Sequence, residues 1–281
     1  MTNLTYTDIS FGYDKGDFIL KNINLNFRTK EIVGILGPNG GGKTTLLKLA
    51  NGLLRPQSGK IFLDNKDIGD FITSQLSQRI LVTFQFTRQQ FFTSTVEKEL
   101  KVTISQYKND TISQLQHLER ILKRLELIDL RDYHPYILSG GEQRRLAIAT
   151  TLASSALFFL LDEPTANLDH KSFELLVTLL QEMRNQGKGI VIVSHDLSFQ
   201  LALCDRLIVL NNGTIEFSGT PFELIKSVKS KKWNFLDLPE IFQFIQRLEP
   251  KKSGNELLKN YIICEDLEEK TQAISNVLEK I

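Results

Sequence analysis

The sequence predicts an α/β fold built around a mainly parallel sheet. Short apolar runs recur along the chain, helix-length segments separate them, and a glycine-rich stretch directly follows the first run. The runs have the length of buried strands and occupy residues 31–36, 157–161, 189–193 and 206–210. Strands that alternate with helices in this way usually pair in parallel, with helices covering both faces of the sheet.

Two further segments are predicted to form antiparallel strands. Residues 18–27, FILKNINLNF, precede the first apolar run, and residues 210–219, LNNGTIEFSG, follow the last. The dipeptide Asn212-Gly213 is a typical hairpin turn, because Asn and Gly accept the positive φ angles that such turns need.

Residues from about 70 to 150 are predicted to form a helical subdomain inserted into a main domain of residues 1–228. The stretch STVE at 94–97 has the spacing of a helix capping box. Farther along, apolar residues recur at intervals of three and four, as on one face of a helix: Ile112, Leu115, Leu118, Ile121, Leu122 and Leu125.

Residues 229–281 are predicted to form a small helical C-terminal extension. The charges of this segment are balanced, and it carries two amphipathic stripes. The stripes consist of Ile241, Phe244, Ile245 and Leu248 after Pro239, and of Ile274, Val277, Leu278 and Ile281 at the end. Such stripes indicate a folded appendage rather than a tail.

Composition and charge exclude several classes of protein. The 281 residues are 41% hydrophobic and 24% charged, and the formal net charge of +1 argues against a generally basic nucleic-acid binder. The two cysteines lie far apart without CxxC spacing, which suits a reduced cytosolic compartment and no metal site. The longest uncharged run, 146–161, is shorter than the roughly 20 apolar residues of a membrane span, and the first residues lack a signal-peptide pattern. We expect a soluble protein.

The stretch GPNGGGKTT at 37–45 fits the phosphate-binding pattern G-x4-G-K-[ST]. It follows a predicted strand and opens a predicted helix, so its backbone N–H groups can surround phosphate oxygens. Lys43 would neutralise the β- and γ-phosphates, and the Thr44 hydroxyl would bind Mg²⁺. An ordinary glycine-rich turn is the alternative. The candidate ATP-binding residues here are Gly37, Pro38, Asn39, Gly40, Gly41, Gly42, Lys43, Thr44 and Thr45.

The stretch LFFLLDEP at 157–164 is an apolar strand that ends in two carboxylates. A parallel strand delivers Asp162 to the edge where open α/β sheets bind ligands, so Asp162 would hold Mg²⁺ through water. Glu163 is placed to polarise an attacking water as general base. The alternative is that these acids only cap a helix.

The stretch LSGGEQRR at 138–145 also precedes a helix and could form a second anion-binding nest. One nucleotide needs only one phosphate loop, so a second nest suggests a phosphate contact made across a dimer interface. A flexible loop is the alternative interpretation.

These motifs resemble the nucleotide-binding subunit of an ATP-binding cassette (ABC) transporter. GPNGGGKTT, LSGGE, LFFLLDEP, ANLD and VSHD match the Walker A, signature, Walker B, D-loop and switch-histidine motifs in family order, over about residues 2–225. The resemblance implies a P-loop NTPase cassette with an antiparallel β subdomain and an inserted helical subdomain. It also implies hydrolysis of ATP with Mg²⁺ between two cassettes.

The resemblance further implies residue roles. Tyr13 would stack on adenine, Gln85 would contact Mg²⁺ and the attacking water, and His195 would contact the γ-phosphate. Signature residues would bind the partner's ATP, and Asp169 would couple the two sites. The signature candidates are Ser139, Gly140, Gly141 and Glu142. Tyr13 could instead be a surface aromatic residue, and His195 could cap the helix that begins near Asp196.

Some residues depart from the family pattern or have no motif support. Gly41 stands where the family commonly has Ser or Cys, but every phosphate-contacting position is kept. Because Glu163 and the signature are both present, nothing marks a degenerate half-site. His117, His134 and His170 are interpreted as structural.

Two segments resemble the ATPases of energy-coupling factor (ECF) importers. These are FQFTRQQFFTSTVEKEL after residue 83 and LDLPEIFQFIQRL at 236–248, although KELKVT departs from the family's continuation. The resemblance implies import of a vitamin or metal ion, at the cytoplasmic face of the membrane. The partners would be a second copy or a paralogous ATPase, a transmembrane coupling subunit and a substrate-binding membrane subunit, with no nucleic acid expected.

Two alternative functions remain open on the sequence. The chain could serve another ABC importer or exporter, or it could be a soluble ABC ATPase outside transport. The aromatic residues of FQFTRQQFF at 84–92 are predicted to line a groove for a membrane partner's helix, with Phe91 or Phe92 packed inward as the alternative.

Overall fold

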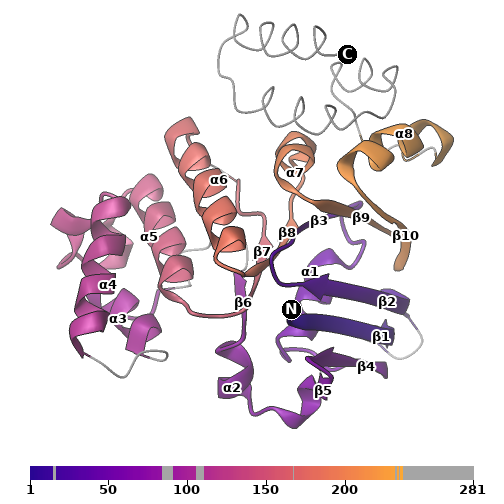
Figure 1. Cartoon of the computed structure of the whole chain (residues 1–281), viewed down its shortest axis with the longest axis horizontal. Helices are drawn as coiled ribbons and strands as arrows, with labels where there is room; N and C mark the ends of the chain where they lie inside the picture. The colour runs from indigo at the N-terminus through magenta and orange to yellow at the C-terminus, as the bar shows by residue number, and fades with distance from the viewer. Residues whose placement is uncertain are drawn as a thin grey trace, which may run out of the picture.

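A computed structural model describes residues 1–14, 17–83, 91–105, 111–166, 168–231, 233 and 235–236. It contains two sheets and a group of helices set to one side of them, as Figure 1 shows. The α/β class is therefore confirmed. Residues 237–281, which make up most of the predicted C-terminal extension, lie outside the described residues, and so does Gln85.

The larger sheet has six strands in the order β10-β9-β3-β8-β7-β6. All are parallel except β10, which forms the predicted hairpin with β9. Asn212 and Gly213 link these two strands with φ angles of 49° and 79°. The strands are β3 (Ile32–Leu36), β6 (Ile80–Thr83), β7 (Phe158–Asp162), β8 (Gly189–Val193), β9 (Arg206–Asn211) and β10 (Thr214–Gly219).

The smaller sheet is antiparallel and has the order β2-β1-β4-β5. Its strands are β1 (Asn3–Phe11), β2 (Leu20–Arg28), β4 (Ser58–Leu63) and β5 (Lys66–Asp67). Arg206 on β9 ties the two sheets together, because its guanidinium donates to the Glu31 carboxylate at 2.7 and 3.0 Å and to the Asn26 carbonyl at 2.7 Å.

Three of the helices form one group at the side of the molecule. In Figure 1, α3, α4 and α5 lie together on the side of the molecule opposite β1, β2, β4 and β5. The helices are α1 (Lys43–Ala50), α2 (Thr73–Ser77), α3 (Val96–Ser105), α4 (Thr111–Arg124), α5 (Gly140–Ala153), α6 (His170–Asn185), α7 (Leu197–Leu203) and α8 (Pro221–Lys231). Three short 3₁₀ helices complete the described elements: η1 (Ile68–Asp70), η3 (Ile128–Leu130) and η4 (Pro135–Ile137).

The structure differs in detail from the helical subdomain that the sequence predicts. The range 70–150 also contains β6, which pairs with β7 at the edge of the parallel sheet. In addition, the hydroxyl of Thr95 accepts a hydrogen bond from the backbone N–H of Lys98 at 3.2 Å. Thr95 is therefore the cap of α3, and the helix begins one residue later than a cap at Ser94 would place it.

Strand β3 separates the two hydrophobic clusters that the described residues form. Ile32 and Leu36 belong to the cluster shared with the helical side, whereas Val33 and Ile35 belong to the cluster beneath the antiparallel sheet and α1. All four side chains are buried, and burial of one such side chain stabilises a fold by about 1.5–3 kcal/mol. A strand buried on both faces is a rigid base for the loop that follows it.

Within the described ranges, no helix combines the length and the apolar composition that crossing a bilayer requires.

Replacing Tyr6 by Phe should test the link between the antiparallel sheet and α1. The buried Tyr6 hydroxyl donates to the Leu46 carbonyl at 3.0 Å, so its loss should lower the free energy of unfolding by about 1 kcal/mol in chemical denaturation. Burial also raises the pKa of the Tyr6 phenol, so the wild type should lose stability above about pH 10, where this phenol ionises only in the unfolded chain.

The matched control is Tyr133→Phe, because Tyr133 is 50% exposed. Its unfolding free energy should match that of the wild type at neutral pH. Equal losses in the two variants would show that the Tyr6 hydrogen bond contributes nothing specific.

Candidate functional site

The carboxyl ends of three neighbouring parallel strands form one edge of the larger sheet. The glycine-rich loop follows β3, two carboxylates end β7, and the segment with His195 follows β8. Because β8 lies between β3 and β7, these segments meet at one cavity of about 650 Å³. The cavity is lined by Tyr13, Ile19, Asn39, Gly40, Gly41, Gly42, Lys43, Thr44, Thr45, Asp162, Glu163, Ala166, Val193 and His195. Its size is typical of sites for small ligands, which span roughly 300–1,000 Å³.

The glycine-rich loop passes very close to the neighbouring strand β9. A Cβ atom on Gly37 would lie 2.1 Å from the Leu210 carbonyl oxygen, and the φ angle of Gly37 is +157°. Only glycine fits that position. Gly41 has no such constraint on φ, and its N–H donates to the Pro38 carbonyl at 3.1 Å.

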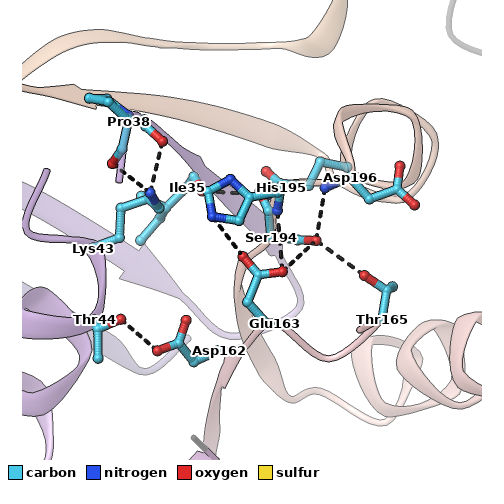
Figure 2. A network of polar contacts seen from close by, with 12 residues as sticks. Ile35, Pro38, Lys43, Thr44, Asp162, Glu163, Thr165, Ser194, His195 and Asp196 are labelled. Atoms are coloured by element: carbon cyan, nitrogen blue, oxygen red, sulfur yellow. Dashed lines mark hydrogen bonds and ion pairs between the residues drawn. The ribbon is translucent and has the colours of Figure 1, made fainter. Parts of the chain in front are cut away.

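Lys43 is held inside the loop rather than on the surface. Its ammonium group donates to the carbonyls of Gly37 and Pro38, each at 2.8 Å, as Figure 2 shows for Pro38. Burial lowers the pKa of Lys43, and the carboxylates of Glu163 and Asp162 act in the opposite direction. An ammonium has three donors, so this geometry leaves one for an anionic ligand.

Thr44, in the first turn of α1, and Asp162, at the end of β7, lie side by side. The Thr44 hydroxyl donates to the Asp162 carboxylate at 2.6 Å, and Asp162 is buried. A hydroxyl and a carboxylate are the hard oxygen ligands that Mg²⁺ prefers, and Mg²⁺ usually takes only one or two such protein ligands beside substrate phosphates. The residues therefore fit a magnesium site. Gln85, the third metal candidate, lies outside the described residues.

Glu163 adopts a left-handed backbone conformation with a φ of +51°. Its N–H donates to the Val193 carbonyl at 2.8 Å, which joins β7 to β8 just beyond their paired residues. One carboxylate oxygen accepts from the Ser194 hydroxyl at 3.4 Å and from the His195 N–H at 3.3 Å. The other carboxylate oxygen lies 3.5 Å from the His195 ring nitrogen Nε2 (Figure 2).

Arg144 supports the same residue from the helical side. Its guanidinium, on α5, donates to the carbonyls of Glu163 and Pro164 at 3.1 and 2.6 Å. The side chain is buried, and burial lowers the pKa of Arg144 to about 10. The backbone that carries Glu163 is therefore fixed from β8 on one side and from α5 on the other.

His195 and the two acids do not cap a helix. The cap of α7 is Asp196, whose carboxylate accepts the Phe199 N–H at 2.9 Å, and the cap of α6 is Asp169, which accepts the Ser172 N–H at 2.7 Å. His195 is instead 57% exposed in its side chain and faces the cavity. The capping alternatives are excluded for His195, Asp162 and Glu163.

Tyr13 lies at the rim of the cavity and is 58% exposed. Its hydroxyl is 3.3 Å from the Thr45 hydroxyl, and its ring packs edge-on against Phe11 at 5.2 Å. The ring is therefore both a surface aromatic and part of the cavity wall, and the stacking on adenine stays a prediction.

The signature segment does not line this cavity. Ser139 caps α5, and its side chain forms a reciprocal capping box with Glu142. The Ser139 hydroxyl donates to the Glu142 carboxylate at 2.7 Å, and this hydrogen bond lowers the pKa of Glu142. Gly140 and Gly141 are exposed, and a Cβ on Gly140 would meet no atom within 4 Å. The segment is an ordered helix start that faces outward, not a flexible loop.

Sequence reasoning did not identify Arg144, Thr165 and Ser194 as parts of this arrangement. The Ser194 hydroxyl lies 3.2 Å from that of Thr165 and accepts the Asp196 N–H at 3.1 Å. Ser194 stands inside VSHD and Arg144 inside LSGGEQRR. Position within a motif was the available signal, but it does not tell which side chains point toward Glu163.

Comparisons with known proteins agree with this geometry. The family model described as ABC transporter matches residues 20–166. A putative ABC transporter ATP-binding protein of Pyrococcus furiosus is 37% identical over 254 residues, which cover 89% of this chain and 95% of that protein. The energy-coupling factor transporter ATP-binding protein EcfA2 of Caldanaerobacter subterraneus subsp. tengcongensis is 33% identical over 273 residues, 93% of this chain and 94% of that protein.

Two solved structures share the fold. The cbiO1 protein from Clostridium perfringens, part of the ABC transporter complex cbiONQ, has a TM-score of 0.71 and 32% identity, covering 86% of this chain and 98% of that one. An ATP-binding cassette in a dimeric, post-hydrolysis state with ADP and Pi has a TM-score of 0.69 and 29% identity, covering 78% and 98%. These similarities confirm the predicted cassette fold.

Replacing Gly37 by Ala should weaken ATP binding through steric conflict with β9. The added methyl group would displace the loop that holds the Lys43 ammonium. We expect the Kd for ATP, measured by isothermal titration calorimetry, to rise about 10-fold or more, which corresponds to a loss of about 1.4 kcal/mol.

Gly41→Ala is the matched control within the same loop. A Cβ there lies 3.0 Å from the Pro38 carbonyl oxygen, which a small shift relieves, so the Kd should change by less than about 3-fold. A similar rise of the Kd in both variants would show that the close contact between Gly37 and the Leu210 carbonyl is not important for ATP binding.

Proposed function

This chain belongs to the ABC transporter family as an ATP-binding and ATP-hydrolysing subunit, and we propose that it energises ECF-type import of a micronutrient. The cargo would be a vitamin or a metal ion. Two such ATPase subunits, identical or paralogous, would act at the cytoplasmic face of the membrane beneath a transmembrane coupling subunit and a substrate-binding subunit. Support for the ECF type comes from the similarity to EcfA2 along most of the chain.

One observation supports a two-subunit mechanism above the others. The phosphate loop, both acids and His195 line one cavity, whereas the signature segment lies outside its lining on an exposed helix start. A helix N-terminus with free N–H groups is suited to bind an anion. We propose that Ser139 and its neighbouring glycines bind the ATP held by the partner cassette, and that Asp169 couples the two sites.

Within its own cavity, we propose that this chain binds the phosphates of ATP and Tyr13 stacks on the adenine. Lys43 would supply a positive charge that burial has already desolvated, which strengthens its attraction to the phosphates. Thr44 and Asp162 would hold Mg²⁺, which supplies positive charge opposite the phosphate oxygens when it is bound. Gln85 keeps its proposed role as a further contact to the metal and the attacking water.

For hydrolysis we propose that Glu163 orients and deprotonates the attacking water and that His195 contacts the γ-phosphate. The two side chains lie 3.5 Å apart, and the Glu163 carboxylate is also held by the Ser194 hydroxyl. Since phosphoryl transfer needs little covalent chemistry from the protein, catalysis here is positioning and electrostatic stabilisation.

A membrane partner would dock at the loop that ends the FQFTRQQFF run. Phe92 is 87% exposed, whereas Phe91 is buried in the core of the helical side, so the pair divides into one packed and one free aromatic ring. The buried Glu99 carboxylate accepts from the backbone N–H groups of Phe92 and Thr93 at 3.1 and 3.0 Å. An exposed aromatic side chain on a backbone that is held in this way suits a protein interface. Residues 84–90 of the run lie outside the described residues.

Replacing Glu163 by Gln should leave ATP binding intact and slow hydrolysis. The amide keeps the size of the side chain but cannot accept a proton, so kcat should fall by about 10²- to 10⁴-fold in a steady-state ATPase assay. Glu174→Gln, an exposed change on α6, should hydrolyse at the wild-type rate. Unchanged turnover in Glu163→Gln would sink the assignment of the base.

Replacing Phe92 by Asp should detach the chain from its membrane partners while ATP affinity stays unchanged. Loss of an aromatic anchor costs about 2 kcal/mol or more, so affinity-purified protein from membranes should carry far less coupling subunit by mass spectrometry, and uptake should fall. Leu115→Asp, a charge at a 45% exposed position on α4, should retain the partners.

The wild-type arm of that experiment also tests the proposed function. Recovery of a membrane-spanning subunit together with a second ATPase supports an importer complex. Recovery without any membrane protein, combined with ATPase activity that responds to RNA or DNA, would favour the non-transport alternative instead.

A further inference from the structure

Gln200 has a fully buried side-chain amide beside the segment that carries Ser194 and His195, and it belongs to none of the sequence motifs. It stands on α7, five residues after His195, and its exposed fraction is 0%. Its side-chain nitrogen donates to the Ser194 carbonyl at 2.8 Å and to the Ile35 carbonyl at 3.4 Å. One side chain therefore binds the ends of two neighbouring strands.

Those two carbonyls belong to the segments that form the site. Ile35 on β3 stands two residues before Gly37, and Ser194 directly follows β8 and precedes His195. Ile35 and Val193 are paired in the sheet, so the amide is placed at the point where both strands leave it. From there one strand continues into the phosphate loop, and the other continues to His195.

The local packing is arranged around this amide. Its oxygen has no hydrogen-bond partner among the described residues, and it lies over the backbone of β3, because a Cβ on Gly34 would be 2.2 Å from it. Gly34 thus admits the amide into a strand that is buried on both faces. An unpaired buried oxygen lowers stability, and an apolar side chain of the same length would avoid that cost. The contribution of Gln200 therefore lies in its nitrogen, which holds the Ser194 and Ile35 carbonyls.

We propose that Gln200 is a positioning residue for hydrolysis, acting through Ser194 on Glu163 and His195. The Ser194 hydroxyl and the His195 N–H are the two groups that donate to the same Glu163 oxygen, at 3.4 and 3.3 Å. By fixing the Ser194 carbonyl, the amide fixes the direction of both donors. This inference rests on the proposed role of Glu163, and it assigns Gln200 no contact with nucleotide.

Gln200→Met tests the role with a side chain of similar length that cannot donate. Because the phosphate loop keeps its own contacts, the Kd for ATP and KM should stay within about 2-fold, while kcat should fall about 10-fold; a misplacement of 1 Å can cost about 10²-fold. Gln200→Leu is a second apolar replacement of different shape, and it should show the same split between KM and kcat. Gln181→Met, at a partly exposed position on α6, is the matched control and should leave both constants unchanged.

A double-mutant cycle with Glu163→Gln separates positioning from general destabilisation. If Gln200 acts through Glu163, Gln200→Met should change the residual single-turnover rate of Glu163→Gln by less than about 2-fold. The inference is overturned if Gln200→Met keeps the wild-type kcat, or if only one of the two apolar variants loses kcat. It is also overturned if Gln200→Met lowers the single-turnover rate of Glu163→Gln by the same factor by which it lowers kcat in the wild-type background. It is also overturned if neither variant folds, because the amide would then serve stability. A wild-type chain that hydrolyses no ATP would instead refute the proposed function.

Discussion

The pairing of β8 with β3 on one side and with β7 on the other is the constraint on which the site depends. Asp162 pairs with Val193, and the next residue, Glu163, donates its N–H to the Val193 carbonyl at 2.8 Å. A slip of two residues along a strand would move every following side chain by about 6.6 Å. The phosphate loop, the two acids and His195 share one cavity only because this register is fixed, and the apolar residues on both faces of β3 fix it.

The buried positive charges of the site share one unusual arrangement. Lys43 and Arg144 each donate to a pair of backbone carbonyls, and the carbonyls belong to the loops that must be held in place. Burial lowers the pKa of both groups. Because these cations bind carbonyls, the carboxylates of Asp162 and Glu163 keep oxygen atoms for other partners. The contacts of Lys43 and Arg144 thus fix the backbone of these loops and leave the two carboxylates available to bind other groups.

Much of this arrangement could be predicted from the sequence, because each motif is contiguous and ends a strand of a parallel sheet. Lys43, Asp162 and His195 meet as that reasoning expects. Sequence reasoning did not identify strand β6, because its short apolar run ILVT lies inside the range that is predicted to be helical. Phe91 and Phe92 are neighbours with opposite burial, which only the backbone direction decides. Arg144 and Gln200 act through contacts across 19 and 165 residues, and no local pattern encodes such distances. The roles given to Tyr13, Gln85 and the signature residues remain predictions.

The capping box at the start of α5 has a thermodynamic consequence for two cassettes that meet. The only hydrogen of the Ser139 hydroxyl is already donated to a charged acceptor, Glu142. To donate to a phosphate of the partner's nucleotide, this hydroxyl would have to leave that carboxylate, so one charge-assisted hydrogen bond replaces another and the net gain is small. The signature segment would then make association depend on the presence of nucleotide, and would add little to its strength. This hydroxyl would favour association only when a phosphate oxygen offers a better hydrogen-bond geometry than Glu142. Without nucleotide, it would contribute nothing to the association of two cassettes.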